Sequence, residues 1–520
     1  MTLSTSVTAE LFDIIIPLFS TPASKAKVHQ FLEDFVVQLR PLHPADAIRV
    51  TEGLKVVVPE HLKKLTEIGS SELIKVQFTG MLIKYFLGDR GLVDLNDVNE
   101  LSPMDTVPYS TLSPADLKTG ESAIGSVGFL KLNGGLGTTM GCTGPKSAIV
   151  VDQGRHFLDF IVDQILDLQV RYRCQIPLIL LNSYYTESET EALIGNRLPF
   201  ISLKQHQVPR IDVRSGEPVS FPDCPTAQWN PPGHGDLYAT LLTSGVLKSL
   251  LDQGITYLFV SNSDNLGASI DLKILGYMIR NQLHFLMETT PKTPSDRKGG
   301  TLVRHHNRLF LLERAQVSAD QNAEFENIER FKIFNTNNIW IDLRQIDTRL
   351  QKMDMDLPLI VNPKTVHGIR VDQLESAMGS AISLFDRSAS VIVPRNRFMP
   401  VKSVSDLMLL RSDVVEKLPS GEVRLSPRRK RRSLPTIQLG SAYQSVAAFD
   451  ALVTVVPSLV DCRSLDISGT VHFGPGVTIV GEVIIRTSHP NGLHLANITL
   501  RDEEVDQGVD GQLIRSPITG

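Results

Sequence analysis

Apolar residues in the first 120 positions of the chain recur at the spacing of α-helices. One helix face is marked by steps of four, one and three residues at Phe31, Phe35, Val36 and Leu39. A passage rich in Ser, Pro and Thr, from Leu101 to Thr119, then interrupts the pattern and is typical of a connector. The pattern predicts a helical N-terminal segment over residues 1–120, in which the apolar positions serve packing.

From about Ser126 the pattern changes to short apolar runs that end in polar residues. These runs are SVGFLKLN at 126–133, IPLILLNS at 176–183 and ITYLFVSNSD at 255–264. Between them lie stretches with helical spacing, such as the one that contains Phe157, Leu158, Ile161, Ile165 and Leu168. The alternation predicts an α/β domain in which helices wrap a mostly parallel sheet, and ligands of such sheets bind beyond the carboxyl ends of the strands.

A six-residue repeat appears near the C-terminus. Its apolar positions form two series, Leu465, Val471, Val477 and Val483, and Ile467, Phe473, Ile479 and Ile485. With turn residues such as Gly474 and Gly476 between them, the repeat predicts a short parallel β-helix, and a plain β-meander is the alternative. A basic run at 428–432 precedes the repeat; we interpret it as a solvated loop rather than as a nuclear import or RNA-binding signal.

Length, net charge and cysteine content restrict the number of domains and the classes of protein to which the chain can belong. A chain of 520 residues exceeds the size at which single cores stop growing, which favours two to four domains. A net charge of -5 gives no general attraction to nucleic acid or to acidic membranes. No uninterrupted apolar run approaches the roughly 18 residues of a membrane span, and the four scattered cysteines indicate neither a zinc site nor a disulfide framework. We expect a soluble, unprocessed, cytoplasmic protein.

The strongest chemical signal is the segment KLNGGLGTTMGCTGPKS at 131–147, which directly follows a predicted strand. Its five glycines let the backbone approach a ligand closely and point amides at phosphate oxygens, and Lys146 adds an ammonium that meets phosphate as a point charge. Two known motifs do not fit. Met140 stands where a dinucleotide fingerprint needs its third glycine, and Pro145 separates Gly144 from Lys146 where a P-loop needs Gly-Lys.

This loop closely resembles that of the eukaryotic-type UTP–glucose-1-phosphate uridylyltransferases, also called UDP-glucose pyrophosphorylases. Further blocks follow in the order of that family: NPPGHGDLYATLLTSG at 230–245, FVSNSDNLGASID at 259–271, KGGTL at 298–302, FKIFNTNNIW at 331–340 and VPRNRFMPVKSVSDL at 393–407. The resemblance covers about residues 40–486, and the blocks together are highly specific.

The resemblance implies a Rossmann-like, GT-A-like nucleotidyltransferase fold with a mixed sheet. The catalytic domain is expected over residues 121–400, and a C-terminal domain with a short left-handed parallel β-helix over 401–520. Mg²⁺ is the expected cofactor. Asp264 ends a hydrophobic strand, where its carboxylate is a hard oxygen ligand for Mg²⁺, and the matching Asp of the family binds the metal.

The resemblance also assigns the remaining site residues. The UTP-binding set comprises Leu132, Asn133, Gly134, Gly135, Lys146, Gln205, Gly233 and Lys402, in which the backbone of 132–135 and the side chain of Gln205 hold the uracil. The set on the glucose 1-phosphate side comprises Gly134, Gly135, His234, Asn262, Asn337, Glu288 and Thr290. His234 lies in a glycine-rich turn that leads into a helix, where a ring donor meets a sugar phosphate. Lys402 matches the second phosphate-binding lysine of the family and is expected to be catalytic together with Lys146.

The implied reaction is an in-line attack by a phosphate oxygen of glucose 1-phosphate on the α-phosphorus of UTP, which yields UDP-glucose and pyrophosphate reversibly. Both reactants are anions, so alignment and charge neutralisation by Mg²⁺, Lys146 and Lys402 are the expected means of catalysis. Thr143 and Ser263 depart from the family, in which lysine and isoleucine are common at these places. The tail after residue 486 does not resemble the animal family ending, so the oligomeric state is open, with a homo-oligomer through the C-terminal domain as one possibility.

Three other functions would fit individual features of the sequence. A nicotinamide-dependent dehydrogenase would explain a Gly-rich loop after a strand, but the glycine spacing is wrong. A non-catalytic regulator would explain the fold and the β-helix, but it would have no need of Lys146, Asp264 and Lys402. Sugar acetylation on the β-helix would need more coils than the sequence displays.

Overall fold

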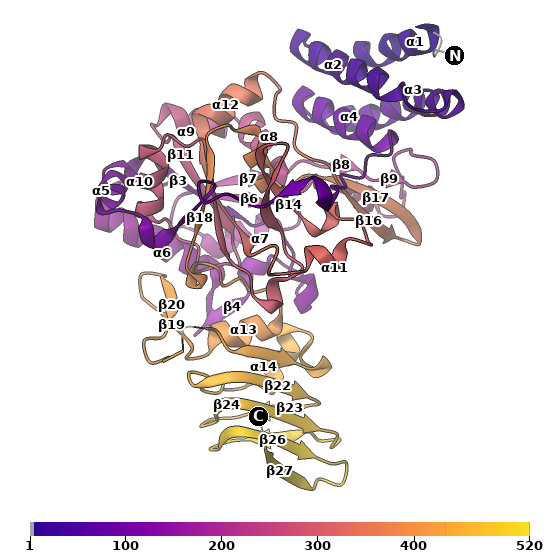
Figure 1. Cartoon of the computed structure of the whole chain (residues 1–520). Helices are drawn as coiled ribbons and strands as arrows, with labels where there is room; N and C mark the ends of the chain where they lie inside the picture. Colours follow the sequence, from indigo (N-terminus) through magenta and orange to yellow (C-terminus); the bar gives the residue numbers. More distant parts are fainter. Residues whose placement is uncertain (1–4, 432, 519–520) are drawn as a thin grey trace. The chain divides into compact units, whose positions relative to one another are not determined.

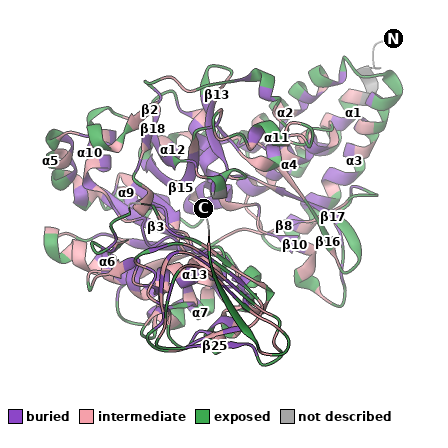
Figure 2. Cartoon of the chain, turned by 60° about the horizontal axis from the view of Figure 1, so that its bottom comes forward, coloured by how far each residue is buried: buried purple, intermediate pink, exposed green. Residues whose placement is uncertain are grey.

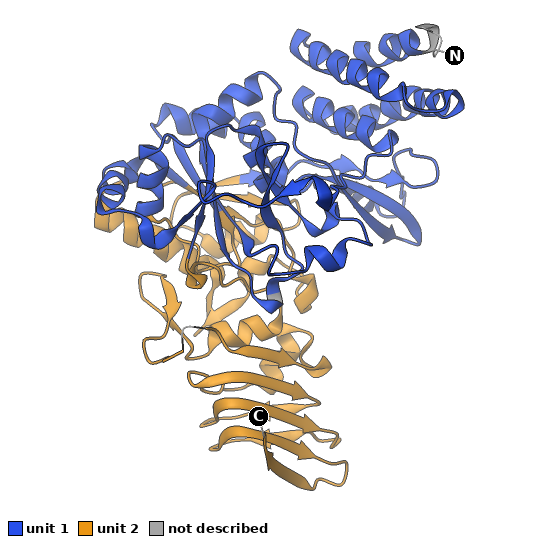
Figure 3. Cartoon of the chain, viewed as in Figure 1, with its two compact units in different colours: residues 1–128, 203–260, 272–393 blue, residues 129–202, 261–271, 394–520 orange. Residues whose placement is uncertain are grey.

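The computed structural model describes residues 5–431 and 433–518 (Figure 1). The chain forms two compact units, coloured in Figure 3: unit 1 comprises residues 1–128, 203–260 and 272–393, and unit 2 comprises residues 129–202, 261–271 and 394–520. The predicted domain boundaries at residues 120 and 400 divide the chain in sequence order and stay predictions. In the described ranges, no helix is both long and apolar enough to cross a bilayer.

Unit 1 begins with the predicted helical segment. Its helices are α1 (Thr5–Ile15), α2 (Pro22–Leu39), α3 (Pro44–Glu67) and α4 (Glu72–Phe86). The apolar face predicted from the sequence lies on α2, where Phe35 and Leu39 are fully buried and Phe31 and Val36 are partly buried. The prediction that these residues serve packing is therefore confirmed.

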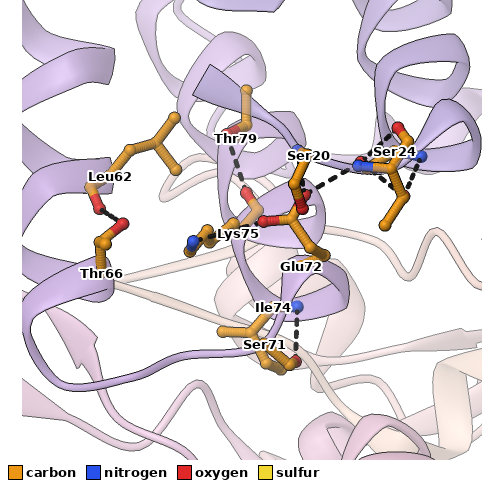
Figure 4. A network of polar contacts seen from close by, with 10 residues as sticks. Ser20, Ser24, Leu62, Thr66, Ser71, Glu72, Ile74, Lys75 and Thr79 are labelled. Atoms are coloured by element: carbon orange, nitrogen blue, oxygen red, sulfur yellow. Dashed lines mark hydrogen bonds and ion pairs between the residues drawn. The ribbon is translucent and has the colours of Figure 1, made fainter. Parts of the chain in front are cut away.

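A carboxylate network links the start of α4 to the start of α2 (Figure 4). Glu72 Oε2 accepts hydrogen bonds from the Ser20 backbone N–H at 2.8 Å and from Ser24 Oγ at 3.0 Å. Its other oxygen, Oε1, accepts one from Lys75 Nζ at 3.3 Å. These bonds favour the ionised carboxylate, so the pKa of Glu72 is lowered although burial alone would raise it.

Five strands form the sheet of unit 1, in the order β2 (Thr106–Pro108), β18 (Ser388–Ile392), β12 (Phe285–Pro291), β15 (Ile333–Asp342) and β11 (Tyr257–Asn262). β18 is parallel to both β2 and β12, whereas β15 is antiparallel to both β12 and β11. Buried residues follow β15 along most of its length (Figure 2). The α/β fold with a mixed sheet is confirmed, and β15 is the departure from a mostly parallel arrangement.

Smaller elements complete unit 1. Its further helices are α5 (Pro114–Ala123), α8 (Leu237–Thr243), α9 (Val246–Asp252), α10 (Leu272–Arg280), α11 (Asn322–Phe325) and α12 (Leu343–Gln351). Its further strands are β1 (Val98–Asn99), β8 (Val208–Pro209), β9 (Ile211–Asp212), β10 (Trp229–Asn230), β13 (Thr301–His305), β14 (Arg308–Leu312), β16 (Ile360–Val366) and β17 (Ile369–Glu375). Several of the sequence blocks lie at the junctions of these elements.

Unit 2 contains the strands that flank the glycine-rich loop. β3 (Val127–Leu132) is parallel to β6 (Leu178–Asn182), which is followed in the sheet by β7 (Phe200–Lys204). The helices of this part are α6 (Phe157–Tyr172), α7 (Glu187–Ile194), α13 (Val404–Arg411) and α14 (Val446–Leu452). The short strands are β4 (Val150–Asp152), β5 (Arg155–His156), β19 (Val415–Lys417) and β20 (Val423–Leu425). The predicted strand and helix runs at 126–183 are confirmed.

The hexad region of unit 2 forms parallel strands. They are β21 (Thr436–Leu439), β22 (Cys462–Ser468), β23 (Val471–Phe473), β24 (Thr478–Thr487), β25 (Leu493–Leu495) and β26 (Thr499–Gln507), and the antiparallel β27 (Leu513–Pro517) follows. Leu465 pairs with Val483, three six-residue steps further along the chain. The eight apolar hexad positions are all at most 3% exposed. The hexads therefore mark core positions, as predicted.

The basic run before this region is not a uniformly solvated loop, so that interpretation is wrong for one of its members. Arg429 is only 7% exposed and donates hydrogen bonds to the carbonyls of Ser433, Leu459, Val460 and Cys462. Arg428 is exposed and pairs with Asp413 at 3.2 Å, and Arg432 lies outside the described residues. Arg429 thus holds the irregular backbone around β22.

Replacement of Val477 by Asp tests the hexad core. The side chain of Val477 is 3% exposed, so the new carboxylate would be buried without a partner, at a cost on the order of several kcal/mol. We expect a lower unfolding temperature, or aggregation, in a thermal melt. Val509→Asp is the matched control, since Val509 is 70% exposed. Equal stability of Val477→Asp and the parent protein would contradict the assignment of this position to the core.

Candidate functional site

The glycine-rich loop starts from the end of β3 and is anchored by buried amides. Asn133 Nδ2 donates to Asn182 Oδ1 and to Thr190 Oγ1, both at 2.8 Å. Ser183 Oγ donates to the Gly134 carbonyl at 2.9 Å. The side chain of Asn133 therefore fixes the start of the loop to the end of β6 and to α7.

The loop folds back on itself so that its two ends meet. The Lys146 backbone N–H donates to the Gly135 carbonyl at 3.2 Å, and the Gly137 N–H donates to the Gly144 carbonyl at 3.3 Å. An isolated bridge between Leu136 and Pro145 closes the same turn. This hairpin brings the terminal lysine beside the glycines that precede it by some ten positions.

Lys146 and Asp264 form an ion pair within unit 2. Lys146 Nζ lies 2.6 Å from Asp264 Oδ2, and the two side chains are 17% and 13% exposed. The other carboxylate oxygen, Asp264 Oδ1, is buried and has no hydrogen-bond partner among the described residues. A buried carboxylate oxygen without a partner is costly, so Asp264 Oδ1 is suited to accept a ligand that supplies positive charge.

Lys402 is connected to the same aspartate through the backbone. The N–H of Val401, its neighbour, donates to the Asp264 carbonyl at 3.1 Å. The Lys402 N–H donates to Asp406 Oδ2 at 2.9 Å, and Ser403 forms a capping box with Asp406 at the start of α13. Asn262 ends β11 two residues before Asp264. The structure thus brings Lys146, Asp264 and the Lys402 backbone together in unit 2.

In unit 1, Gln205 and His234 meet at one turn. Gln205 Nε2 donates to the Gly233 carbonyl at 3.1 Å. Gly233 has a φ of +78°, and a Cβ at this position would lie 2.4 Å from the Ser376 carbonyl oxygen, so only glycine fits. The Met378 N–H donates to His234 Nδ1 at 2.9 Å. Because Nδ1 accepts, the proton of the neutral ring is on Nε2.

The candidate sugar-side residues of unit 1 lie where β12 and β15 change register. Glu288 pairs with Asn338, but Thr289 pairs with Asn335, so two residues of β15 bulge, and Asn337 among them has a φ of +62°. The buried Glu288 carboxylate accepts from Trp340 Nε1 at 2.9 Å and from Asn338 Nδ2 at 3.1 Å.

Thr290 lies one residue beyond the register change. Its hydroxyl is buried without a hydrogen-bond partner in the part of the chain that the structure describes. A buried hydroxyl without a partner, next to a bulge in the neighbouring strand, is a feature that β-bulges beside active sites can have. The roles predicted for Glu288, Thr290 and Asn337 stay predictions.

Two further buried polar groups, one in each unit, were not among the predicted site residues. Asp236 accepts hydrogen bonds from the His206 N–H at 2.7 Å, from His206 Nδ1 at 2.8 Å and from Thr240 Oγ1 at 3.0 Å, which supports the segment next to Gln205. Lys131 is fully buried in β3 and donates to backbone carbonyls around Asp264. The only sequence signal was a charged residue inside an apolar strand run, at Lys131.

The chain is similar to known proteins over most of its length. The family model of UTP–glucose-1-phosphate uridylyltransferase matches residues 76–480. The UTP–glucose-1-phosphate uridylyltransferase of Hordeum vulgare is 42% identical over 454 residues, which cover 85% of this chain and 95% of that protein. The enzyme of the same name from Saccharomyces cerevisiae is 42% identical over 426 residues, which cover 79% of this chain and 85% of that protein.

Solved structures give the same result. The UDP-glucose phosphorylase of Trypanosoma brucei superposes with a TM-score of 0.79 at 36% identity and covers 86% of this chain and 99% of that one. A variant of the Leishmania major UDP-glucose pyrophosphorylase in complex with UDP-glucose superposes with a TM-score of 0.81 at 33% identity, over 87% and 99% of the two chains. The matched region contains every candidate site residue, and the chain belongs to the UTP–glucose-1-phosphate uridylyltransferase family.

Proposed function

We propose that this protein transfers the uridylyl group of UTP to glucose 1-phosphate and releases pyrophosphate. The observation that carries the proposal is the Lys146–Asp264 pair, in which a lysine at the end of a glycine hairpin meets a strand-end aspartate with one unpartnered buried oxygen. Family membership supports the choice of substrates. It also removes the support for a dehydrogenase, which rested on the glycine-rich loop alone.

The reaction needs alignment and charge neutralisation more than acid–base chemistry. A phosphate oxygen of glucose 1-phosphate is ionised near neutral pH, so it attacks the α-phosphorus of UTP in line without a general base, and pyrophosphate leaves. Backbone amides of the hairpin orient the nucleotide, while Lys146 and Lys402 neutralise the charge that accumulates on the phosphates. No covalent intermediate on the protein is required.

The residues present fit Mg²⁺ as the cofactor. Among the described residues there is no group of three or more His, Cys, Asp or Glu that would hold an ion alone. Mg²⁺ usually binds through one or two carboxylates together with substrate phosphates, which matches a single strand-end Asp264 with a free Oδ1. When bound, the ion supplies positive charge to the phosphates. Asp264 would hold it, with the Lys146 ammonium beside it.

His234 acts in this proposal as a neutral hydrogen-bond donor. Burial of the ring lowers the pKa of His234 to about 4, and the Met378 N–H occupies Nδ1. At neutral pH the ring is therefore uncharged and offers Nε2–H as a hydrogen-bond donor to an acceptor such as a substrate phosphate. It does not act as a general acid, because the imidazolium form is not populated. Gln205 and the Gly233 backbone, on the same turn, are proposed to contact the uracil.

We further propose Asn262 and Asn337, which lie in family blocks, as contacts of glucose 1-phosphate. Glu288 and Thr290 are proposed from the resemblance as contacts of the sugar hydroxyls. The buried hexads and parallel strands support a left-handed β-helix, and the mixed α/β sheet supports a GT-A-like catalytic fold. The proposal includes a homo-oligomer through the C-terminal domain and a cytoplasmic setting.

A matrix of pyrophosphate-release assays tests the proposed substrates. UTP, ATP, TTP and GTP are each combined with several sugar 1-phosphates at fixed Mg²⁺. We expect the highest kcat/KM with UTP and glucose 1-phosphate, because a base pocket built from backbone groups and Gln205 leaves a purine with unmatched hydrogen bonds. Equal turnover with ATP would reject the proposed base specificity.

Alanine substitution of Lys146, Lys402 and Asp264 tests their assigned roles. Loss of one pre-positioned charge is expected to reduce kcat by roughly 100- to 1,000-fold, by analogy with single oxyanion donors. Asp264→Ala is expected also to raise the Mg²⁺ concentration needed for half-maximal rate. Steady-state kinetics across a Mg²⁺ titration measure both effects, beside thermal unfolding of each variant.

The matched control for these substitutions is an exposed pair of the same chemistry. Lys248 and Asp252 lie 2.7 Å apart with side chains 80% and 62% exposed, so Lys248→Ala and Asp252→Ala are expected to retain the parental rate. A near-normal rate in any of the three test variants removes that residue from the mechanism. Loss of folding in one of them would instead assign it a structural role.

The low pKa of His234 predicts a specific pH dependence of stability. Between about pH 6.5 and 4 the unfolded chain binds a proton at this histidine and the folded chain does not, so the free energy of unfolding falls as the pH falls. In denaturant titrations, His234→Gln is expected to reduce that slope by up to about 1.4 kcal/mol per pH unit. The buried His61, whose pKa is also lowered to about 4, contributes equally to both proteins. An unchanged slope would show that His234 is not held neutral.

A further inference from the structure

Lys131 is a charged residue in the middle of a buried strand. It lies in β3, where its side chain is fully buried. An ammonium group in a protein interior is costly unless hydrogen bonds replace its hydration. Lys131 Nζ donates to the carbonyls of Ala268 at 3.0 Å, Asn265 at 3.4 Å and Asn262 at 3.5 Å, and lies 4.7 Å from the centre of the Phe129 ring. These partners offset the loss of water.

The three acceptors belong to one segment of unit 2, residues 262–268, which starts at the last residue of β11 and is irregular after it. Within the segment, the Asn262 carbonyl accepts from the Asn265 N–H and the Asn265 carbonyl from the Ala268 N–H, both at 3.3 Å, which are long hydrogen bonds. The Lys131 ammonium adds a second donor to each of these two carbonyls and donates its shortest hydrogen bond to the Ala268 carbonyl, so one group ties three points of the segment together. The shape of the turn therefore depends on the Lys131 side chain.

That turn carries Asp264, and it also positions the backbone that leads to Lys402. Asn265 Nδ2 donates to the Arg397 carbonyl at 3.1 Å, and Asn265 Oδ1 accepts from the Met399 N–H at 3.0 Å. The Asp264 carbonyl accepts from the Val401 N–H at 3.1 Å. A shift of the 262–268 turn would move both the carboxylate and the segment that ends at Lys402.

A connection to the glycine-rich loop completes the arrangement. Leu132, the residue after Lys131, accepts at its carbonyl a hydrogen bond from the Ser263 N–H at 3.1 Å. The start of the loop and the turn with Asp264 are thus joined at two successive residues of β3, once through the backbone and once through a buried ammonium.

We propose that Lys131 is a positioning residue, whose buried ammonium fixes the 262–268 turn so that the Asp264 carboxylate is held ready for a divalent cation. This inference rests on the proposed function for the role of Asp264. It goes beyond that function because Lys131, which is fully buried, is not one of the proposed substrate or metal contacts.

Hydrogen exchange of the full-length protein tests the structural half of the proposal. In Lys131→Met, which keeps the side-chain length and removes the donors, we expect backbone amides of residues 262–268 to exchange about tenfold faster or more. The matched control is Lys417→Met. Lys417 is a partly buried lysine of the same unit that donates to the Leu410 carbonyl at 3.0 Å, and its loss is expected to leave exchange at 262–268 unchanged.

Cation binding tests the functional half. Mn²⁺, titrated against the protein without substrate and followed by electron paramagnetic resonance, is expected to bind Lys131→Met roughly 10- to 100-fold more weakly than the parent protein, as for lost partners of metal ligands. In assays, the Mg²⁺ concentration for half-maximal rate is expected to rise with little change in the KM for glucose 1-phosphate. Lys131→Arg, which keeps the charge and the donors, is expected to recover part of the Mn²⁺ affinity.

The outcomes separate the two proposals. Unchanged exchange at 262–268 in Lys131→Met overturns the positioning role whether or not the protein has uridylyltransferase activity. Absence of turnover in the parent protein, together with faster exchange at 262–268, rejects the proposed function alone. If Lys131→Met does not fold, the same comparison is made with Lys131→Gln, and unchanged exchange in that variant overturns the role.

Discussion

Buried backbone groups outside helices and strands must find hydrogen-bond partners, and the candidate site depends on how this chain supplies them. In the turn after β11, the Lys131 ammonium and the Asn265 amide add hydrogen bonds to those that the backbone forms itself. The glycine hairpin is fixed by Asn133. Each of these side chains is buried and polar, and each acts on irregular backbone. Regular structure supplies the frame, while a few buried polar residues give the functional segments a defined conformation.

The same principle operates away from the site. Arg429 satisfies four carbonyls around the first strands of the hexad region, and Glu72 joins the start of two N-terminal helices. In each case a long or branched charged side chain is held by several partners. Removal of such a residue would leave several buried polar groups without a partner. Removal of an exposed charged residue costs less, because its former partners are solvated by water.

The sequence predicted those features that depend on local periodicity. The buried face of α2, the strand ends at Asn133 and Asp264, and the hexad core follow from spacing alone, since one face of each element is apolar. Apolar spacing does not distinguish a parallel from an antiparallel strand. The sequence therefore predicted a mostly parallel sheet and did not reveal that β15 is antiparallel to its neighbours. The family blocks predicted the candidate residues that unit 2 brings together, Lys146, Asp264 and Lys402, although their roles came from the resemblance.

Charged residues were the main source of error, because their burial depends on partners far along the chain. Arg429 lies in a run of basic residues that reads as solvated, yet its acceptors include carbonyls some thirty residues later. Lys131 finds its acceptors more than 130 residues later. A charged residue in an apolar strand indicates that hydrogen-bond partners must offset the cost of burying its charge. The sequence alone does not identify those partners.

The pairing of Lys146 with Asp264 has a consequence for which ligand the site accepts under the proposed function. Each charge neutralises the other, and both side chains are largely buried. An anion that pairs only with Lys146 would leave Asp264 without its partner, and a cation that pairs only with Asp264 would do the same to Lys146. Binding of either ion alone therefore loses part of its favourable free energy, because a partly buried charge left unpaired is costly. A ligand that carries both charges, such as a nucleoside triphosphate with its divalent cation, satisfies both groups at once, so the ion pair favours the complex over either component alone.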